Sequence, residues 1–170
     1  MRRILNGYLR RWRVWRARAS GVQIASDCRM VNYPNFGSEP YLISIGPHVL
    51  ISGQVVFITH DGGTHVFRNR ERFHGVIKYG RIVVHENCFI GFRATLLAGV
   101  SVGPNSVVAG CALVSRDVPP GVVVGGVPAR HLMTVEEYAE RSRERCPVYD
   151  QKRYRADKRS ELLRLYPKPW

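Results

Sequence analysis

Residues 84–119 read VHENCF IGFRAT LLAGVS VGPNSV VAGCAL VSRDVP, which is six consecutive hexapeptides. Each begins with an aliphatic residue, namely Val84, Ile90, Leu96, Val102, Val108 and Val114. The fifth position is always small or β-branched, namely Cys88, Ala94, Val100, Ser106, Ala112 and Val118. A strand repeats every two residues and a helix every 3.6 or so, so a period of six predicts a coil with one hexapeptide to each flat side. An ordinary buried strand pair is the alternative, but chance rarely keeps one register over six units.

The same phase occurs upstream of these hexapeptides. Ile45, Ile51 and Phe57 are six apart, and so, in more irregular surroundings, are Ile24, Met30 and Phe36. We therefore expect an all-β solenoid domain over residues 22–132, with degenerate first coils at 22–44 and an excursion at 61–80. Gly91 and the Gly103-Pro104 step are expected to supply the turns between sides, where a positive or fixed φ is favoured.

The formal net charge of +13 is carried by the two ends of the chain. Residues 1–18 hold seven Arg and no acidic residue, residues 141–170 hold ten basic and four acidic residues, and residues 19–140 hold nine of each. A nucleic-acid enzyme would concentrate charge on its folded groove, so no nucleic-acid partner is expected. No apolar run approaches the roughly 20 residues of a membrane span. The four Cys show no C-x-x-C spacing and follow no secretory segment, which favours a cytoplasmic protein without a bound metal.

Residues 1–21 are expected to form a basic amphipathic helix. Its apolar residues fall on one side at helical spacing, namely Ile4, Leu5, Tyr8, Leu9, Trp12 and Trp15, and most of its Arg fall on the other. Two interpretations stay open. Residues 1–18 lie on an anionic surface at the inner face of a membrane, or the apolar side caps the first coil. An organellar transit peptide is less favoured, because the segment contains a single Ser and leads straight into the fold.

Residues 133–170 are expected to form a basic helical extension. Thr134 and Glu137 fit a capping box that begins a helix ending near Arg145, before Pro147. A second short helix is expected over residues 150–166, followed by a tail at 167–170.

Several segments of the chain resemble one known family. They are CFIG at 88–91, LLAGVSVG at 96–103, VSRDVPP at 114–120 and GGVPAR at 125–130. They are similar to the hexapeptide-repeat acyltransferases, and within these to the maltose, galactoside and polysaccharide O-acetyltransferases. The resemblance covers about residues 22–132 and implies a left-handed parallel β-helix, here with N-terminal and C-terminal helical extensions. It also implies a homotrimer with active sites between subunits and acetyl-CoA as donor, none of which follows from spacing alone.

His60 stands where the coil ends and the excursion begins. Transfer of an acetyl group from a thioester to a hydroxyl needs a base that takes the hydroxyl proton, and neutral imidazole suits that task near physiological pH. The resemblance places the catalytic His of the family here, so His60 is the candidate base; a His that merely ends a strand is the alternative. Asp61 orients the imidazole, binds the acceptor or forms a turn with Gly62-Gly63, and we favour the turn.

The excursion mixes cationic and aromatic side chains, namely Phe67, Arg68, Arg70, Arg72, Phe73, Lys78 and Tyr79. Aromatic faces stack on sugar rings and Arg binds carboxylate or phosphate. The resemblance implies that this loop closes over the acceptor, so the candidate acceptor-binding residues are Asp61, His65 and Arg68. Asn32 is added because relatives have a polar acceptor-binding residue near this place. A solvated charged loop is the alternative.

The resemblance also implies a donor site. In relatives, the pantetheine arm of acetyl-CoA lies along the coils at positions that match Phe92 and Gly110. Phe89 stands where many relatives have Trp. The candidates near the nucleotide phosphates are Ser115, Arg116 and Arg130, because guanidinium groups make charge-assisted hydrogen bonds to phosphate. Exposed Arg residues without a ligand are the alternative.

The sequence and its resemblance therefore predict an acetyl-CoA-dependent O-acetyltransferase that acts on a carbohydrate hydroxyl by direct transfer, without a metal. A surface polysaccharide or a lipid-linked glycan precursor is the expected acceptor. N-acetylation of an amino sugar or antibiotic stays open, because the same base serves an amine. A non-catalytic scaffold and a γ-carbonic-anhydrase-like zinc enzyme using His60, His65 and His85 are further alternatives, although the close His pair here precedes the lone His.

Overall fold

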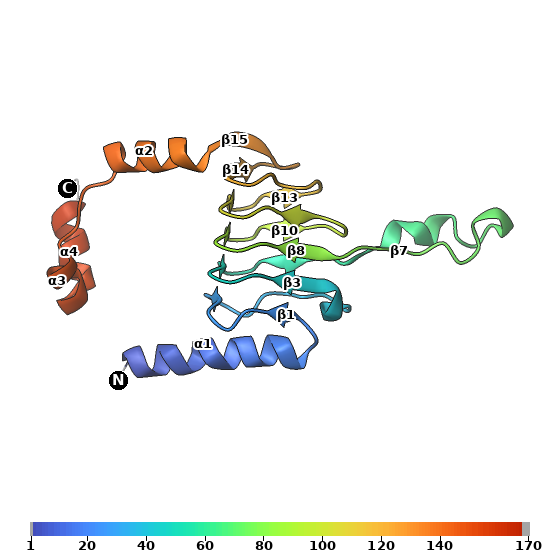
Figure 1. Cartoon of the computed structure of the whole chain (residues 1–170), viewed down its shortest axis with the longest axis horizontal. Helices are drawn as coiled ribbons and strands as arrows, with labels where there is room; N and C mark the ends of the chain where they lie inside the picture. Colours follow the sequence, from blue (N-terminus) through green and yellow to red (C-terminus); the bar gives the residue numbers. More distant parts are fainter. Residues whose placement is uncertain (1, 168–170) are drawn as a thin grey trace. The chain divides into compact units, whose positions relative to one another are not determined.

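The computed structural model describes residues 2–167, with side chains for residues 8, 9 and 11–167. It forms two compact units, and the boundary between them falls at Val135 and Glu136. The first unit contains the β-strands and the second consists of helices (Figure 1). Residues 168–170 of the predicted tail and the predicted positions of the Ile4 and Leu5 side chains lie outside the described residues.

The first unit is a stack of coils whose short strands form three parallel sheets (Figure 1). The first sheet contains β1 (Gln23–Ile24), β3 (Ile43–Ile45), β8 (Ile82–Val84) and β11 (Ser101–Val102). The second contains β2 (Arg29–Met30), β4 (Leu50–Ile51), β9 (Phe89–Ile90), β12 (Val107–Val108) and β14 (Val122–Gly125), with β15 (Arg130–Thr134) added antiparallel to β14. The third contains β5 (Val56–Phe57), β10 (Thr95–Leu96) and β13 (Leu113–Val114).

The strand register shows that three hexapeptides make one turn of the coil. Val84 pairs with Val102 across one coil, and Leu96 pairs with Val114, so partners are three hexapeptides apart. The aliphatic first positions are at most 1% exposed from Val84 to Val114, and the fifth positions are at most 5% exposed from Cys88 to Val118. The predicted upstream positions, from Ile24 to Phe57, are buried too. Burial of these rows in one continuous core stabilises each coil through its neighbours.

Gly91 and Gly103 each adjoin a turn between sides and Pro104 lies within one, as predicted, but the expected positive φ of these glycines is wrong. Gly91 and Gly103 do not have positive φ; the non-glycine residues that do are His48, Gln54, Asn87, Arg93, Asn105 and Cys111. A Cβ on Gly91 would lie 2.5 Å from the backbone nitrogen of Gly110, and one on Gly103 would lie 2.6 Å from that of Pro120. The next coil passes too close for a side chain, so stacking of the coils requires these two glycines.

Helix α1 (Arg2–Ala19) covers the end of the solenoid at β1 and β2 (Figure 1). Val14 and Ala17 are buried there. Arg13 and Arg18 donate hydrogen bonds to backbone carbonyls of the first coil. The helix therefore caps the solenoid, but not through its predicted apolar side, since the exposed residues include Tyr8, Trp12 and Trp15.

The excursion leaves the solenoid as a long protrusion (Figure 1). At its base β6 (His60–Asp61) pairs antiparallel with β7 (Lys78–Tyr79). Between them lie two short 3-10 helices, Gly62–Val66 and Glu71–Phe73.

The helical part of the chain consists of α2 (Val135–Arg145), α3 (Gln151–Ala156) and α4 (Lys158–Leu165). The prediction of one helix over residues 150–166 is wrong, because Asp157 has φ −144° and ψ 95° and separates α3 from α4. Its side chain accepts hydrogen bonds from the backbone nitrogens of Arg159 and Ser160, which is typical of an N-cap. Within residues 2–167, no helix is both long and apolar enough to cross a membrane.

Candidate active site

His60 lies at the corner of the solenoid that follows the third sheet. Because β5, β10 and β13 stack in that sheet, the residues that follow them lie one above another. The hollow at this corner has a volume of about 360 Å³, and its lining includes Ile58, His60, Lys78, Leu97, Ala98 and Ser115. These residues are termed the His60 corner below.

Glu39 holds the imidazole of His60. It immediately precedes a 3-10 helix, Pro40–Leu42, and its side chain is only 12% exposed. Its Oε2 atom lies 2.9 Å from Nδ1 of His60 and accepts a 2.6 Å hydrogen bond from Oγ1 of Thr59. An imidazole that donates its Nδ1 proton to a carboxylate keeps Nε2 free to accept one, so this pair is arranged for general base catalysis.

The surroundings of Glu39 keep it ionised. The hydrogen bond from Thr59, followed by the one with His60, lowers the pKa of the Glu39 carboxyl to about 2. Glu39 therefore remains a carboxylate at every pH at which an imidazole titrates. A carboxylate at Nδ1 stabilises the imidazolium that forms when Nε2 takes a proton.

Asp61 is engaged by its own loop. Its Oδ1 accepts a 2.9 Å hydrogen bond from the backbone nitrogen of Gly63, and its Oδ2 lies 3.1 Å from Nζ of Lys78. The Gly63 hydrogen bond and then Lys78 lower the pKa of the Asp61 carboxyl. This geometry agrees with the favoured turn, and the carboxylate that lies within hydrogen-bond distance of the His60 imidazole is that of Glu39.

Sequence reasoning missed Glu39. It lies 21 positions before His60, in a segment without regular repeats. One turn of the coil brings a residue beneath another about three hexapeptides later, as in the pairing of Asn35 with Val56. Glu39 could therefore have been found by looking for an acidic residue about one turn of the coil before His60.

His65 and Arg68 line a different hollow, within the excursion. This hollow has a volume of about 480 Å³, and its lining residues are His65, Arg68, Asn69, His74, Gly75 and Ile77. The structure thus separates these two acceptor-binding candidates from the His60 corner of the same chain.

Asn32, Phe92 and Gly110 lie at another corner, which follows the second sheet. A Cβ on Gly53 would lie 3.3 Å from the Phe92 ring and 3.4 Å from Nδ2 of Asn32, and one on Gly110 would lie 3.3 Å from the Phe92 carbonyl. Asn32, Gly53, Phe92 and Gly110 are termed the Phe92 corner below. Phe89 is partly exposed on the second sheet, just before this corner.

The candidates for phosphate binding are also divided. Ser115 lines the hollow beside His60, and Arg116 is exposed at the next position. Arg130 begins β15, where its guanidinium donates a 3.2 Å hydrogen bond to the Ala129 carbonyl.

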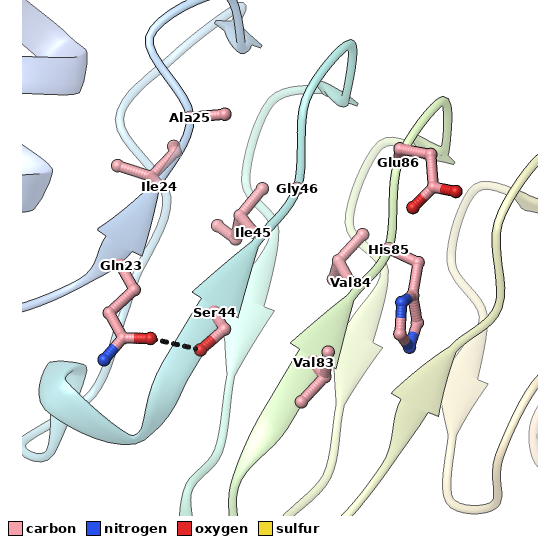
Figure 2. Close-up of a pocket in the computed structure, with 10 residues that line it drawn as sticks. All are labelled: Gln23, Ile24, Ala25, Ser44, Ile45, Gly46, Val83, Val84, His85 and Glu86. Carbon is pink, nitrogen blue, oxygen red and sulfur yellow. Dashed lines mark hydrogen bonds between the residues drawn. The ribbon is translucent and has the colours of Figure 1, made fainter.

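His85 lies away from both other histidines of the zinc alternative. It lines a groove of about 370 Å³ on the first sheet, together with Gln23, Ser44 and Glu86 (Figure 2). Its Nε2 lies 3.2 Å from Oγ of Ser101. Within one chain, His85 is therefore separate from His60 and His65.

Comparisons with known proteins agree with the fold. A family model described as bacterial transferase hexapeptide (six repeats) matches residues 81–116. Protein CapG of Staphylococcus aureus is 41% identical over 123 residues, which cover 71% of this chain and 70% of CapG. The galactoside O-acetyltransferase of Escherichia coli is 31% identical over 108 residues, which cover 62% of this chain and 52% of that enzyme.

A solved structure shows the same likeness. The hexapeptide-repeat-containing acetyltransferase of Vibrio cholerae aligns with a TM-score of 0.52 and 25% identity, over 74% of this chain and 81% of that one. That enzyme has also been crystallised with acetyl coenzyme A. This chain belongs to the hexapeptide-repeat acyltransferases, as the resemblance predicted, and is an enzyme of the acyltransferase class.

Proposed function

We propose that this protein transfers the acetyl group of acetyl-CoA to a hydroxyl of a carbohydrate, with His60 as general base. The observation that carries the proposal is the pairing of the His60 imidazole with the Glu39 carboxylate, beside an open hollow. The acetyl-CoA complex of the Vibrio cholerae enzyme supports the donor. The similarity to a galactoside O-acetyltransferase supports the class of acceptor.

The reaction follows from the geometry of this pair. Nε2 of His60 takes the proton of the acceptor hydroxyl as its oxygen attacks the thioester carbonyl carbon. The carbon–sulfur bond then breaks, and the coenzyme A thiolate takes the proton back from the imidazolium. Glu39 is a positioning residue: it holds the ring and stabilises the imidazolium. Direct transfer of this kind needs no covalent enzyme intermediate.

The proposed assembly is a homotrimer of left-handed parallel β-helices with active sites between subunits. The division of the candidates between the His60 corner and the Phe92 corner supports it, because a neighbouring chain can bring the two corners together. In this arrangement Phe89, Phe92 and Gly110 line the pantetheine path, and Asn32 reaches the acceptor. Ser115, Arg116 and Arg130 bind the nucleotide phosphates. His65 and Arg68 bind the acceptor from the excursion.

The test is the variant His60→Ala, assayed with acetyl-CoA and a panel of saccharides that includes amino sugars. Loss of the base should lower kcat by about 10²–10⁴-fold. Calorimetric binding of acetyl-CoA should stay nearly unchanged, since the imidazole does not hold the donor. The control is His85→Ala, which removes an exposed imidazole from the first sheet and should keep full activity.

Unchanged turnover in His60→Ala would remove His60 from the mechanism. Acetylation of amino groups alone would replace the acceptor half of the proposal by N-acetylation. Failure of the wild-type protein to bind acetyl-CoA would favour the scaffold alternative.

A further inference from the structure

Helix α1 presents a second face, opposite to the one that caps the solenoid. Tyr8, Trp12 and Trp15 are 77%, 44% and 64% exposed. Together with Arg11 they line a shallow hollow of about 420 Å³. The four residues stand at positions i, i+3, i+4 and i+7 and therefore share one side of the helix. They are termed the aromatic face of α1 below.

The capping contacts fix the direction of the aromatic face. Val14 and Ala17 are buried against the first coil, and Arg13 Nη1 donates a 2.7 Å hydrogen bond to the carbonyl of Met30. Arg18 donates in the same way to the carbonyl of Ile24, at 2.7 Å. Rotation of the helix would break these contacts. Because α1 lies across the end of the solenoid, the aromatic face forms the outer surface of that end (Figure 1).

The chemistry of this surface matches an anionic lipid bilayer. Trp and Tyr rings favour the headgroup layer, where one end of the ring is apolar and the other is hydrated. Arg side chains are attracted to anionic lipid phosphates, and residues 1–18 carry seven Arg and no acidic residue. We propose that α1 docks this protein on an anionic membrane surface, with Tyr8, Trp12 and Trp15 in the headgroup layer and Arg11 on lipid phosphates.

Other occupants fit the aromatic face less well. A second copy of α1 would bring together two helices whose charged residues are all Arg, with Arg11 on the contact face, and like charges repel. A soluble acidic glycan could stack on the rings, but its binding would not require an aromatic row at the outermost surface of the unit. The lipid surface accounts for the rings, the charge and the outward direction together.

Tryptophan fluorescence tests the proposal directly. The chain has three Trp, so Trp170→Phe leaves Trp12 and Trp15, both on the aromatic face. With vesicles of phosphatidylcholine and phosphatidylglycerol, the emission should shift to the blue and be quenched by brominated lipid. Pure phosphatidylcholine should give much weaker binding, and added salt should weaken binding to the mixed vesicles, because salt screens exposed charges.

Two variants of α1 assign the binding to the aromatic face, with sedimentation as the measurement. Tyr8→Ser with Trp15→Ser should lower partitioning into the mixed vesicles about ten-fold. Arg11→Glu changes the local charge by two and should lower it about 30-fold. The matched control is Tyr138→Ser with Tyr166→Ser, which removes two rings, 48% exposed in α2 and 56% exposed just after α4. It should bind vesicles like the wild type.

Three results would overturn the proposal. The first is vesicle binding that survives both α1 variants. The second is no vesicle binding, with an oligomer that these variants dissociate, which would make the face an interface between copies. The third is no vesicle binding, with an acidic oligosaccharide bound through the same residues. Vesicle binding by His60→Ala separates docking from the proposed reaction, and equal melting temperatures show that the α1 variants fold.

Discussion

The contact between Glu39 and His60 gives the first prediction at the scale of single residues. Glu39→Gln should lower kcat by about 10²–10⁴-fold. The amide can turn its NH₂ group toward Nδ1, which favours the tautomer that carries its proton on Nε2 and cannot act as a base. The KM for acetyl-CoA should change little, because the 2.9 Å contact is with the imidazole. Steady-state kinetics measure both quantities.

Glu86→Gln is the matched control, since Glu86 is an exposed carboxylate beside the groove of the first sheet. It should leave kcat unchanged. Equal losses in the two variants would point to a general effect on folding, and full activity of Glu39→Gln would show that the carboxylate does not position the base.

The pH dependence of the reaction follows from the ionisation of Glu39. Because its pKa is lowered to about 2, this carboxyl stays charged at all pH values above that region and gains its proton only in strong acid. The acid limb of kcat/KM should therefore report one group, the base itself, with unit slope in a plot of log kcat/KM against pH. A slope of two above pH 4 or so would mean that a second group titrates with it, contrary to the low pKa of Glu39.

At the scale of elements, the closeness of neighbouring coils makes Gly91 sensitive to substitution. A Cβ at this position would meet the backbone of Gly110 at 2.5 Å and that of Ala109 at 2.6 Å. Backbone cannot move aside as a flexible side chain can, so Gly91→Ala should destabilise the protein by about 1–3 kcal/mol. Gly62→Ala is the control, because nothing lies within 4 Å of its Cβ. Denaturant unfolding compares the two, and equal stability would show that the coils can separate without cost.

The α3–α4 pair depends on one buried carboxylate. Glu161 is 2% exposed; its Oε1 accepts a 2.8 Å hydrogen bond from the backbone nitrogen of Asp150, and it is paired with Arg164. The pairing with Arg164 and then the Asp150 hydrogen bond lower the pKa of Glu161 to about 2. A lowered carboxyl pKa stabilises the folded form above the unfolded value, and this contribution is lost as pH falls from about 4.5 toward 2.

Glu161→Gln should therefore lose helical circular dichroism of this region at neutral pH and show a weaker acid transition than the wild type. Glu144→Gln, an exposed glutamate of α2, is the control and should behave like the wild type. An unchanged acid transition in Glu161→Gln would mean that the pair is held by other contacts.

The elements also show what a sequence can predict here. The hexapeptide core was predictable because each buried position repeats locally, from Val84 to Val114. The stacking role of Gly91 was not, because it depends on which backbone passes above it. The break at Asp157 went unpredicted because its side chain can either end one helix or begin another. The side of α1 that covers the first coil could not be predicted either. The buried residues Val14 and Ala17 form a smaller apolar surface than the exposed rings, so the sequence pattern favours the other side of the helix.

At the scale of the whole molecule, the candidate site is divided between two corners of one chain. The hollow at the His60 corner includes Ser115, whereas Phe92 and Gly110 stand at the corner that follows the second sheet. A solenoid with three sheets keeps these corners apart at every coil. In the proposed homotrimer, a complete site would take one corner from each of two neighbouring subunits.

Mixed assemblies of two inactive variants test this division. His60→Ala disables the His60 corner, and Gly110→Leu places a side chain over the donor path at the Phe92 corner, where Gly110 is exposed. Each variant alone should be nearly inactive. In trimers formed from equal amounts of the two, half of the sites take their His60 corner from a Gly110→Leu chain, in which it is intact. Half of these take their Phe92 corner from a His60→Ala chain, so about a quarter of all sites combine two intact corners. Activity per site should recover to that fraction when the two are co-expressed.

The control mixes His60→Ala with Glu39→Gln. Both substitutions lie at the same corner, since the two side chains are in contact at 2.9 Å, so no pairing of subunits restores an intact His60 corner. This mixture should stay as inactive as its components. Recovery in the first mixture and none in the second would place the site between subunits, with the base from one chain and the donor path from the next. No recovery in either mixture, with trimers present, would mean that each chain completes its own site, and the proposed division of the site between subunits would be wrong.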